Sequence, residues 1–505
     1  MVWKNLKQSI VLSGVLIMGV LPSYIRAQDL KEFEKSVTEF TLDNGLKFLV
    51  LERHQAPVVS FHTYADVGSV DEVKGITGMA HLFEHMAFKG SRSVGTRDYL
   101  AEAEAMKRVD EAFHALKRER SKLGEDRQNS LQNMEKRLEE AQEEASLHLV
   151  HDEFEQALIR EGAGGLNAST SRDATRYILS MPSNKVELWM SLESDRFFQP
   201  VLREFYKERD VVMEERRLRT ESQPVGRLME EFVAVAYKAH PYGEPTIGHM
   251  SDLETMTREE AQVFYNKYYS PGNLTIAIVG DVDPSQIREL AQTYFGRIPS
   301  GPKPDQVETV EPTQLGERRV TIEESSQPFI LMGYHKPGIN HPDNAVFDAI
   351  TDILGVGRTS RLYKGLVREK KIAVSVSAFQ GFPGSKHPGL FVFYAVPSRG
   401  STPLECEMAL TAEIEKLKTE LVSVEELEKA KTRARAGLIR ALSSNSGLAR
   451  QLTFFEVVTG DWKNLFTQLE QVEQVTADDI QRVAKGYFEK RNRTVGLIET
   501  SPAGE

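Results

Sequence analysis

Cysteine is almost absent from this sequence, since Cys406 is the only one among 505 residues. A single cysteine excludes a disulfide within the chain, so the stability of the folded protein has to come from buried apolar cores. The chain is too long for one such core, and its apolar content of 40% and charged content of 27% are those of ordinary globular proteins. These values predict a folded protein with more than one domain.

Basic charge is not in excess either. The sequence has 63 Lys and Arg residues against 74 Asp and Glu residues, which gives a net charge of −11. Proteins that bind nucleic acids or anionic membrane surfaces carry a clear surplus of positive charge. The composition therefore argues against nucleic acid as a partner and offers no basic patch for a membrane surface.

Long apolar runs are missing from the chain beyond its first residues. The N-terminus has Lys4 and Lys7, then an apolar segment at 10–21, then Ala27 before a polar stretch. This order predicts a secretory signal peptide over residues 1–27, cleaved after Ala27, with no stable membrane span left behind. An uncleaved membrane anchor is the alternative, although the segment is short for a span of about 20 residues. Export of a chain without disulfides favours the bacterial periplasm.

The two halves of the chain repeat one order of strands and helices. In the first half, Asp43-Asn44-Gly45 separates two alternating apolar stretches and predicts a β-hairpin, followed by a strand over 58–67 and a helix. In the second half, "QPFILMGYHKP" reads as a strand and "NAVFDAITDILGVG" as a helix. The predicted fold class is α+β, with two similar domains, each a mostly antiparallel sheet with helices on one face.

A segment rich in proline and glycine separates these halves. We expect an N-terminal domain at 36–295, a linker at 296–317 and a C-terminal domain at 318–500. A strongly charged segment interrupts the first domain at about 103–152, and its leucines recur near heptad spacing around Gly124. This pattern predicts an inserted hairpin of two long helices. A solvated, merely connecting charged helix remains the alternative.

The stretch "GMAHLFEHMAFKG" places His81, Glu84 and His85 in one short apolar run. On a helix, residues 81 and 85 are one turn apart and project from one face, where two imidazoles can share a zinc ion. Glu84 is too close in sequence to be a relaxed third ligand, and it is well placed to accept a proton from a water molecule at the metal. Two hydrogen-bonded histidines without a metal are the alternative.

A third ligand has to come from elsewhere in the chain. The helical segment "YKERDVVMEERRLRTES" offers Glu208, Glu214 and Glu215. Glu208 and Glu215 are two helical turns apart and share a face, whereas Glu214 is rotated about 100° away. Glu215 is thus the candidate ligand and Glu208 an auxiliary acid. A charged, solvated helix face is the alternative for this segment.

Five motifs occur in an order that resembles the pitrilysin family of zinc peptidases, the inverzincins: "HLFEHMAFKG", "GLNASTSRDATRY", "ERDVVMEE", "HPYGEPTIG" and "GNLTIAIVGDVDP". The chain is most similar to the half-length branch, which includes the mitochondrial processing peptidase subunits and bacterial relatives. The resemblance covers residues 36–500 apart from the charged segment. It implies one zinc ion per chain held by His81, His85 and Glu215, with Glu84 as general base and Glu208 as auxiliary carboxylate.

The resemblance also implies an activity. It points to a zinc metalloendopeptidase that hydrolyses small or unfolded peptides inside a closed chamber. The edge strand that binds substrate in this family matches "GLNAST", so Asn167 and Ala168 are expected to contact the peptide backbone. Adding an extended peptide to a sheet edge is a common recognition mode.

One departure from the family pattern affects the expected partner. The family's arginine and tyrosine that stabilise the reacting carbonyl fall in a segment that reads "VREKKIAVSV" here, with Arg368 present and Val374 where the tyrosine belongs. The resemblance therefore implies the zinc-bearing subunit of a heterodimer, whose other, zinc-free chain supplies an arginine and a tyrosine; a homodimer stays open. Two alternatives are a structural subunit similar to respiratory-complex core proteins, and a metal-binding chaperone that holds peptides without cutting them.

Overall fold

The structure is a computed structural model that describes residues 33–122 and 127–500. The chain divides into a short unit, Met1–Ser36, and a large one, Val37–Glu505, and the elements below belong to the second. The predicted signal peptide and the predicted corner at Gly124 lie outside the described residues. No helix in the described part is long and apolar enough to cross a membrane.

The first half builds a six-stranded sheet in the order β1-β2-β6-β3-β5-β4. All neighbouring strands are antiparallel except β2 and β6, which are parallel. The predicted hairpin at Asn44 is confirmed, since β1 and β2 pair across it and Gly45 takes a φ of 95°. The strands are β1 (Val37–Thr41), β2 (Lys47–Glu52), β3 (Val58–Ala65), β4 (Gly164–Thr170), β5 (Thr175–Pro182) and β6 (Leu274–Gly280).

The second half builds a five-stranded sheet in the order β7-β11-β8-β10-β9. Here too one pair, β7 with β11, is parallel and the others are antiparallel. The order and direction match those of β2-β6-β3-β5-β4, so the sheet confirms the predicted duplication of an α+β unit. The strands are β7 (Arg318–Glu324), β8 (Phe329–Lys336), β9 (Ala373–Phe382), β10 (Gly389–Pro397) and β11 (Arg493–Thr500).

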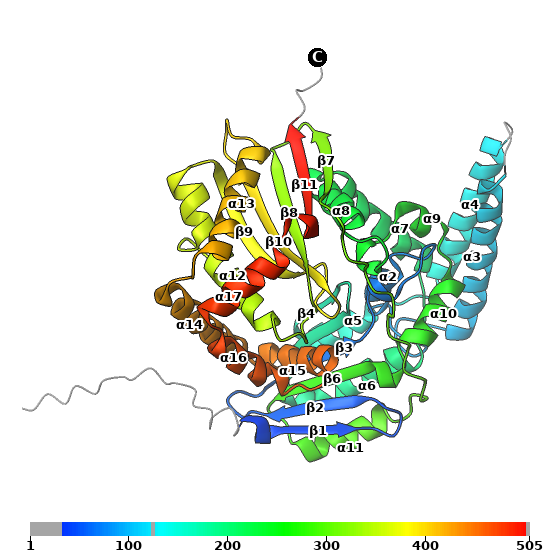
Figure 1. Cartoon of the computed structure of the whole chain (residues 1–505). Coiled ribbons are helices and arrows are strands. Elements are labelled where there is room, and N and C mark those ends of the chain that lie inside the picture. The colour runs from blue at the N-terminus through cyan, green and yellow to red at the C-terminus, as the bar shows by residue number, and fades with distance from the viewer. Residues whose placement is uncertain (1–32, 123–126, 501–505) are drawn as a thin grey trace, which may run out of the picture. The chain divides into compact units, whose positions relative to one another are not determined.

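Helices surround both sheets (Figure 1). Those of the first half are α2 (Met79–Met86), α3 (Tyr99–Arg120), α4 (Arg127–Ser146), α5 (Glu153–Arg160), α6 (Val186–Phe198), α7 (Phe205–Arg216), α8 (Pro224–Ala236), α9 (Met250–Thr255), α10 (Arg258–Tyr268) and α11 (Pro284–Tyr294). Those of the second half are α12 (Asn344–Gly355), α13 (Pro403–Thr419), α14 (Val424–Ala441), α15 (Asn445–Thr459), α16 (Asn464–Gln474) and α17 (Ala477–Tyr487), with a π-helical segment, η6, at Tyr363–Glu369. α12 occupies the place of α2 in the repeat.

One helix from each half packs against the sheet of the other half. α15 packs on β3 and β6, where Thr453 Oγ1 lies 2.8 Å from Nδ1 of the buried His62. α8 packs on β7 and β11, and a Cβ on Gly333 would lie 2.8 Å from the ring of Phe232. The first sheet's own helix α6 covers the opposite face of β3, because Trp189 stacks on Phe61 with ring centroids 4.1 Å apart. The sequence predicted helices on one face only, and these exchanged helices add cover on the other.

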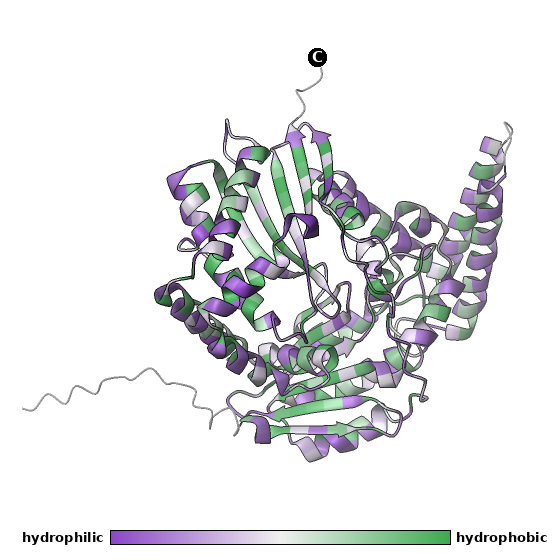
Figure 2. Ribbon diagram, viewed as in Figure 1, coloured by the Kyte–Doolittle hydropathy of each residue, from purple (hydrophilic) through white to green (hydrophobic). Residues whose placement is uncertain are grey.

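Apolar side chains fill the space between these layers. β3 and β6 are buried along almost their whole length, as expected for strands that are covered on both faces. Figure 2 shows hydrophobic residues concentrated in the strands of both sheets, whereas the distal part of the α3–α4 pair is mostly hydrophilic. Because burial of this kind is the main stabilising contribution, the chain needs no disulfide.

The predicted helical arm exists as α3 and α4, which pack against each other (Figure 1). The part of α3 up to Leu116 belongs to the core of the first half, because it contributes buried residues as far along as Leu116. Phe113 stacks on Tyr206 of α7, and Asp110 accepts hydrogen bonds from Tyr206 Oη and Arg258 Nε. The polar, solvent-exposed part of the arm is therefore shorter than the segment 103–152 expected from composition.

The predicted linker contains no helix or strand between residues 300 and 315. It is nevertheless held to both halves. The carboxylate of Glu311 accepts hydrogen bonds from the backbone N–H groups of residues 238–240, and Gln314 Nε2 donates to the carbonyl of Arg493 at 2.7 Å. These contacts fix the path by which the chain passes from α11 to β7.

Candidate metal centre

The helix that carries the sequence motif begins at a constrained turn. Gly78 precedes α2 with a φ of 91°, and a Cβ there would lie 2.6 Å from the carbonyl oxygen of Ile247. Glu72 caps this end of the helix, since its carboxylate accepts hydrogen bonds from the N–H groups of Gly78 and Ala80 at 2.8 and 2.7 Å. Burial raises the pKa of Glu72 to about 8, so the cap rests on these two hydrogen bonds, which satisfy N–H groups that have no partner within the helix.

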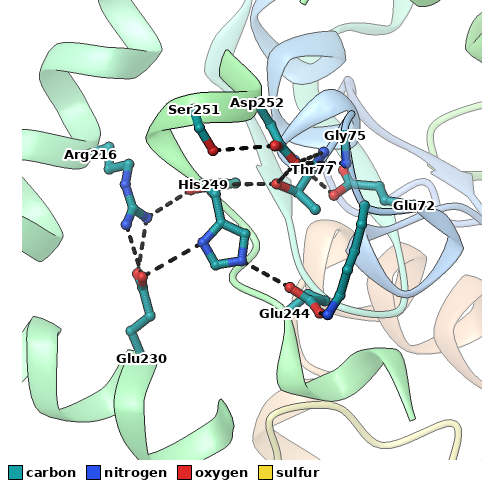
Figure 3. A network of polar contacts seen from close by, with 12 residues as sticks. Glu72, Gly75, Thr77, Arg216, Glu230, Glu244, His249, Ser251 and Asp252 are labelled. Carbon is teal, nitrogen blue, oxygen red and sulfur yellow. Dashed lines mark hydrogen bonds and ion pairs between the residues drawn. The ribbon is translucent and has the colours of Figure 1, made fainter. Parts of the chain in front are cut away.

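A polar network ties the same turn to the helices that follow α7 (Figure 3). Thr77 donates from its hydroxyl to Asp252 Oδ2 at 2.7 Å, and the backbone N–H of His249 donates to Thr77 Oγ1. Arg216, next to Glu215, donates to both carboxylate oxygens of Glu230 at 2.8 and 2.9 Å and to the carbonyl of Gly248 at 2.7 Å. The network thus links the segment before α2 to the end of α7.

The structure brings His81 and His85 of α2 together with Glu215 of α7. His81 Nε2 lies 3.7 Å from Glu215 Oε1, and His85 Nε2 lies 3.5 Å from Glu215 Oε2. One ligand atom from each of the three residues falls within 4.8 Å of the others. Two imidazoles and one carboxylate form the donor set of a catalytic zinc site. Burial lowers the pKa of His81 to about 4, which keeps its imidazole neutral, as a metal ligand has to be.

The other ring nitrogens of the two histidines have different surroundings. His85 Nδ1 lies 3.4 Å from Glu208 Oε2, and the other carboxylate oxygen of Glu208 lies 2.6 Å from Lys89 Nζ. Although burial opposes it, the contacts of Glu208 with His85 and Lys89 lower the pKa of Glu208 to about 2. A carboxylate in this place turns the imidazole so that Nε2 faces the metal position. His81 Nδ1, by contrast, is buried without a hydrogen-bond partner among the described residues.

Glu84 and Glu214 differ from the three ligand candidates. Glu84 lies half-buried on α2 between the histidines and does not belong to the group of converging ligand atoms. Burial raises the pKa of Tyr269 to about 12, and the charge of Glu84 adds to this shift. Glu214 is exposed and pairs with Arg217, as its rotation on the helix predicted.

The strand expected to bind substrate is an edge strand. Among the described strands β4 pairs only with β5, with Asn167 opposite Ile178 and Ala168 opposite Tyr177, and it contacts α2. Asn167 is exposed and Ala168 half-buried. One row of backbone N–H and C=O groups of β4 is therefore open to another strand beside the metal centre.

A cavity of about 310 Å³ adjoins the metal centre. His81 and Glu215 line it together with Arg172, Arg219 and Phe382. Phe382 comes from the second half, at the end of β9. Arg172 belongs to the quoted motif "GLNASTSRDATRY", which pointed to the region without identifying this residue, and nothing in the sequence pointed to Phe382.

The structure does not bring Arg368 to this centre. Arg368 is exposed on η6, whose neighbours are β9 and α13. Val374 is 56% exposed on β9, the edge strand of the second sheet. Neither residue lines the cavity beside His81, so within this chain they lie apart from the candidate metal ligands.

Two family profiles match the chain. The profile described as insulinase (peptidase family M16) matches residues 47–118 and 138–249, and the profile described as peptidase M16 inactive domain matches residues 255–434. The chain belongs to peptidase family M16. This confirms the resemblance seen in the sequence motifs. The first profile includes the three converging residues and leaves out residues 119–137, the distal part of the α3–α4 arm.

Individual M16 proteins agree with this assignment. Zinc protease PqqE of Helicobacter pylori is 28% identical to this chain over 505 residues, 98% of this chain and 99% of the relative. The crystal structure of a protease from Helicobacter pylori superimposes with a TM-score of 0.77 at 26% identity, covering 92% of this chain and 99% of that chain. The mitochondrial-processing peptidase subunit beta of Lentinula edodes is 25% identical, covering 89% of this chain and 86% of the relative. The two-domain M16 fold thus accounts for nearly the whole chain.

Proposed function

We propose that this M16 protein is a zinc-dependent endopeptidase that hydrolyses peptide bonds in small or unfolded peptides. The observation that carries the proposal is the convergence of His81, His85 and Glu215 within 4.8 Å, with Glu84 on the same helix but outside that set. The name of the Helicobacter pylori relative, a zinc protease, supports it. A zinc ion in such a site polarises the peptide carbonyl and lowers the pKa of a water molecule.

We assign the proton transfers to Glu84. Its carboxylate takes a proton from the attacking water molecule and delivers it to the nitrogen of the leaving amine, so that one side chain serves as base and then as acid. Its half-buried position on α2 limits exchange of that proton with bulk water. We assign to Glu208 the task of orienting His85, which agrees with the 3.4 Å contact between them.

We propose that the peptide binds as an added strand along β4. The free edge of β4 and its contact with α2 support this arrangement, because a strand paired there passes close to the helix that carries the histidines. Backbone hydrogen bonds from residues around Asn167 and Ala168 would then provide affinity without regard to side chains. Such binding requires an extended peptide, which is why small or unfolded substrates fit and folded proteins do not.

We further propose that the active form contains a second, homologous chain. Arg368 lies on η6, which contacts β9 and α13, and does not line the cavity beside His81, and Val374 offers no hydrogen-bond donor. This chain alone therefore lacks the arginine and tyrosine expected at the reacting carbonyl. A zinc-free partner that carries both groups would complete the site and close the chamber; a homodimer is the other arrangement. The N-terminal sequence supports export, with the periplasm as the compartment.

Zinc analysis and peptide hydrolysis test this proposal together. We expect about one zinc ion per chain in the unchanged protein and in Glu84→Gln, and little zinc in His81→Ala or Glu215→Gln. Glu84→Gln should reduce hydrolysis of a quenched fluorescent peptide by about 10²–10⁴-fold, the usual contribution of a general base. The control is Glu214→Gln, since Glu214 is exposed on the same helix as Glu215 and should affect neither measurement.

The outcomes separate the alternatives. Full zinc retention in both His81→Ala and Glu215→Gln would reject the ligand assignment. Zinc loss in Glu84→Gln would make Glu84 a ligand and not the base. Zinc and peptide binding without any turnover, even with a partner chain present, would identify a peptide-holding subunit, and absence of both zinc and peptide binding would identify a structural one.

A further inference from the structure

The cavity beside the metal centre is lined by two arginines, and one of them, Arg172, forms no ion pair in the described part of the chain. Arg172 and Arg219 both line it. Arg219 forms an ion pair with Glu215. The guanidinium of Arg172 makes one hydrogen bond, to Thr246 Oγ1, its Nε is buried without a partner, and it forms no ion pair among residues 33–122 and 127–500. A guanidinium that has lost water without gaining an anion is costly, so Arg172 is the unusual member of this site.

The charges of Glu72 and Asp173 act on Arg172, but the oxygens of both carboxylates are hydrogen-bonded to other groups. Glu72 accepts from the backbone N–H groups at the start of α2. Asp173 accepts hydrogen bonds from Tyr242 Oη and from the N–H groups of Ser385 and Lys386, the last two at 2.7 and 3.1 Å. Each of these acids therefore holds a part of the fold in place and leaves the guanidinium of Arg172 available to a ligand.

The remaining acid that lines the cavity is also committed. The carboxylate of Glu230 accepts hydrogen bonds from both terminal guanidinium nitrogens of Arg216. Apart from Glu215, which faces the two histidines, the cavity therefore presents positive charge and hydroxyl groups to any molecule that enters. An anionic group fits this arrangement, and a cationic one does not.

The walls of the cavity suit a carboxylate carried on an apolar stem. Phe382 and Val233 line it, the first from the end of β9 and the second from α8. The turn after Phe382 is held in place by Asp173 and by the ion pair of Lys386 with Asp66 at 2.7 Å. Thr170, the last residue of β4, also lines the cavity. A peptide that pairs with β4 would therefore extend towards this cavity.

We propose that this cavity is a subsite for a carboxylate of the peptide substrate, bound by the guanidinium of Arg172. The inference rests on the proposed peptidase function and names the substrate class of that site: peptides that place a glutamate side chain, or their own C-terminal carboxylate, close to the scissile bond. Arg172 forms the ion pair, Thr246 holds the guanidinium, and Phe382 and Val233 contact the methylene groups of the stem. The arginine thus determines specificity and takes no part in the proton transfers.

Paired peptides test the proposal and distinguish the two sources of the carboxylate. One pair differs by Glu against Gln at each position flanking the scissile bond, and the other by a free against an amidated C-terminus. We expect kcat/KM to favour the carboxylate by about ten- to hundredfold in one pair, the usual range for a charge-assisted hydrogen bond. Arg172→Gln should bring the ratio of kcat/KM values within that pair close to one, whatever its effect on the uncharged peptide, and Arg172→Lys should keep part of the preference. Arg217→Gln is the control, because Arg217 is an exposed arginine paired with Glu214 and should leave the preference unchanged.

A binding measurement separates this inference from the peptidase assignment. Fluorescence anisotropy of the labelled peptides is recorded with zinc-loaded Glu84→Gln, with and without Arg172→Gln. Tighter binding of the carboxylate peptide that depends on Arg172 supports the subsite even where no peptide is cut. Equal affinity for the members of both pairs overturns it, even where peptides are cut. A carboxylate preference that survives Arg172→Gln also overturns the proposed subsite, since the metal or Arg219 would then bind the carboxylate.

Discussion

Glu208 Oε2 lies 3.4 Å from His85 Nδ1, on the side of the ring opposite the nitrogen that faces Glu215. Lys89 holds the other oxygen of Glu208 at 2.6 Å. The sequence indicated Glu208 as an auxiliary acid because it shares a helix face with Glu215. From this contact we infer that Glu208 determines which imidazole nitrogen of His85 carries the proton.

Glu208→Gln should therefore weaken zinc binding without abolishing it. Loss of a carboxylate behind a histidine ligand commonly costs about 10–100-fold in metal affinity. Competition with a zinc-sensitive dye gives the affinity directly. Glu204→Gln is a matched control, because Glu204 also contacts Lys89, at 3.0 Å, but not His85. Equal zinc affinities of the two variants would show that Glu208 acts only through Lys89.

The distal part of the α3–α4 arm should be dispensable for the metal centre. Replacing residues 119–135 by a short Gly-Ser loop removes mainly exposed, charged positions and surface ion pairs such as Arg120 with Glu135, which are worth about 0–1 kcal/mol each. We expect the shortened protein to keep its zinc content and its thermal unfolding midpoint within a few degrees of the full chain. A large loss of either would mean that the arm supports the metal domain along its whole length.

Removing the whole charged segment, 103–152, should by contrast prevent folding. The deletion would remove Phe113, which stacks on Tyr206, and the buried Asp110. Phe113→Ala alone should cost about 3–5 kcal/mol in the free energy of unfolding, the usual cost of such a truncation in a core. Denaturant unfolding of this variant is the measurement, and the exposed Leu100→Ala is its control. Similar stabilities of the two variants would contradict the burial of the arm's base.

An ion pair in the second half should make stability depend on acid pH. Arg361 donates to both oxygens of Glu426 at 2.7 and 2.8 Å, and chiefly through these hydrogen bonds the pKa of Glu426 is lowered to about 2 from its ordinary 4.5. A lowered pKa means that this stabilisation is complete above pH 4.5 and is lost as the pH falls towards 2. Because Glu426 is partly exposed, its contribution is about 1 kcal/mol after allowance for solvent screening.

The comparison that isolates this effect is Glu426→Gln against Glu425→Gln, an exposed neighbour on the same turn of α14. The unfolding midpoint of Glu426→Gln should lie below that of the unchanged protein at pH 6, and the two should approach each other by pH 3. Glu425→Gln should follow the unchanged protein throughout. A constant difference between Glu426→Gln and the unchanged protein would mean that a lost cap at the start of α14, and not titration, explains the change.

The sequence predicted the parts of this molecule that depend on local pattern. Asn44 and Gly45 define a hairpin by their backbone preferences, and His81 and His85 lie one helical turn apart whatever surrounds them. Even the distant Glu215 could be proposed, because its helix also offers Glu208 on the same face. These inferences needed only the geometry of a single element and the chemistry of a known donor set.

Features that depend on contacts between the two halves could not be predicted from the sequence. The exchange of α8 and α15 between the sheets leaves no local signal, since the sequence of a helix does not indicate which sheet its buried residues will contact. Arg172 was part of a quoted motif, but its unbalanced charge becomes visible only when the partners of Asp173 and Glu72 are known. Phe382 reaches the metal cavity through a turn of the second sheet, about 300 residues from His81 along the chain.

The last prediction concerns activity and rests on Val374. A developing oxyanion needs hydrogen-bond donors aimed at it in a dry site, and loss of one such donor often costs about 3–4 kcal/mol in the barrier. Val374 can donate nothing, and Arg368 lies exposed on η6 away from the cavity. We therefore expect the isolated chain to be a poor peptidase and a homologous chain with an arginine–tyrosine pair to restore turnover. The assay compares kcat/KM for a quenched peptide before and after mixing, with a partner whose tyrosine is changed to phenylalanine as the control. If the isolated chain equals the mixture, the heterodimer proposal fails and the oxyanion donor has to come from this chain or from its second copy.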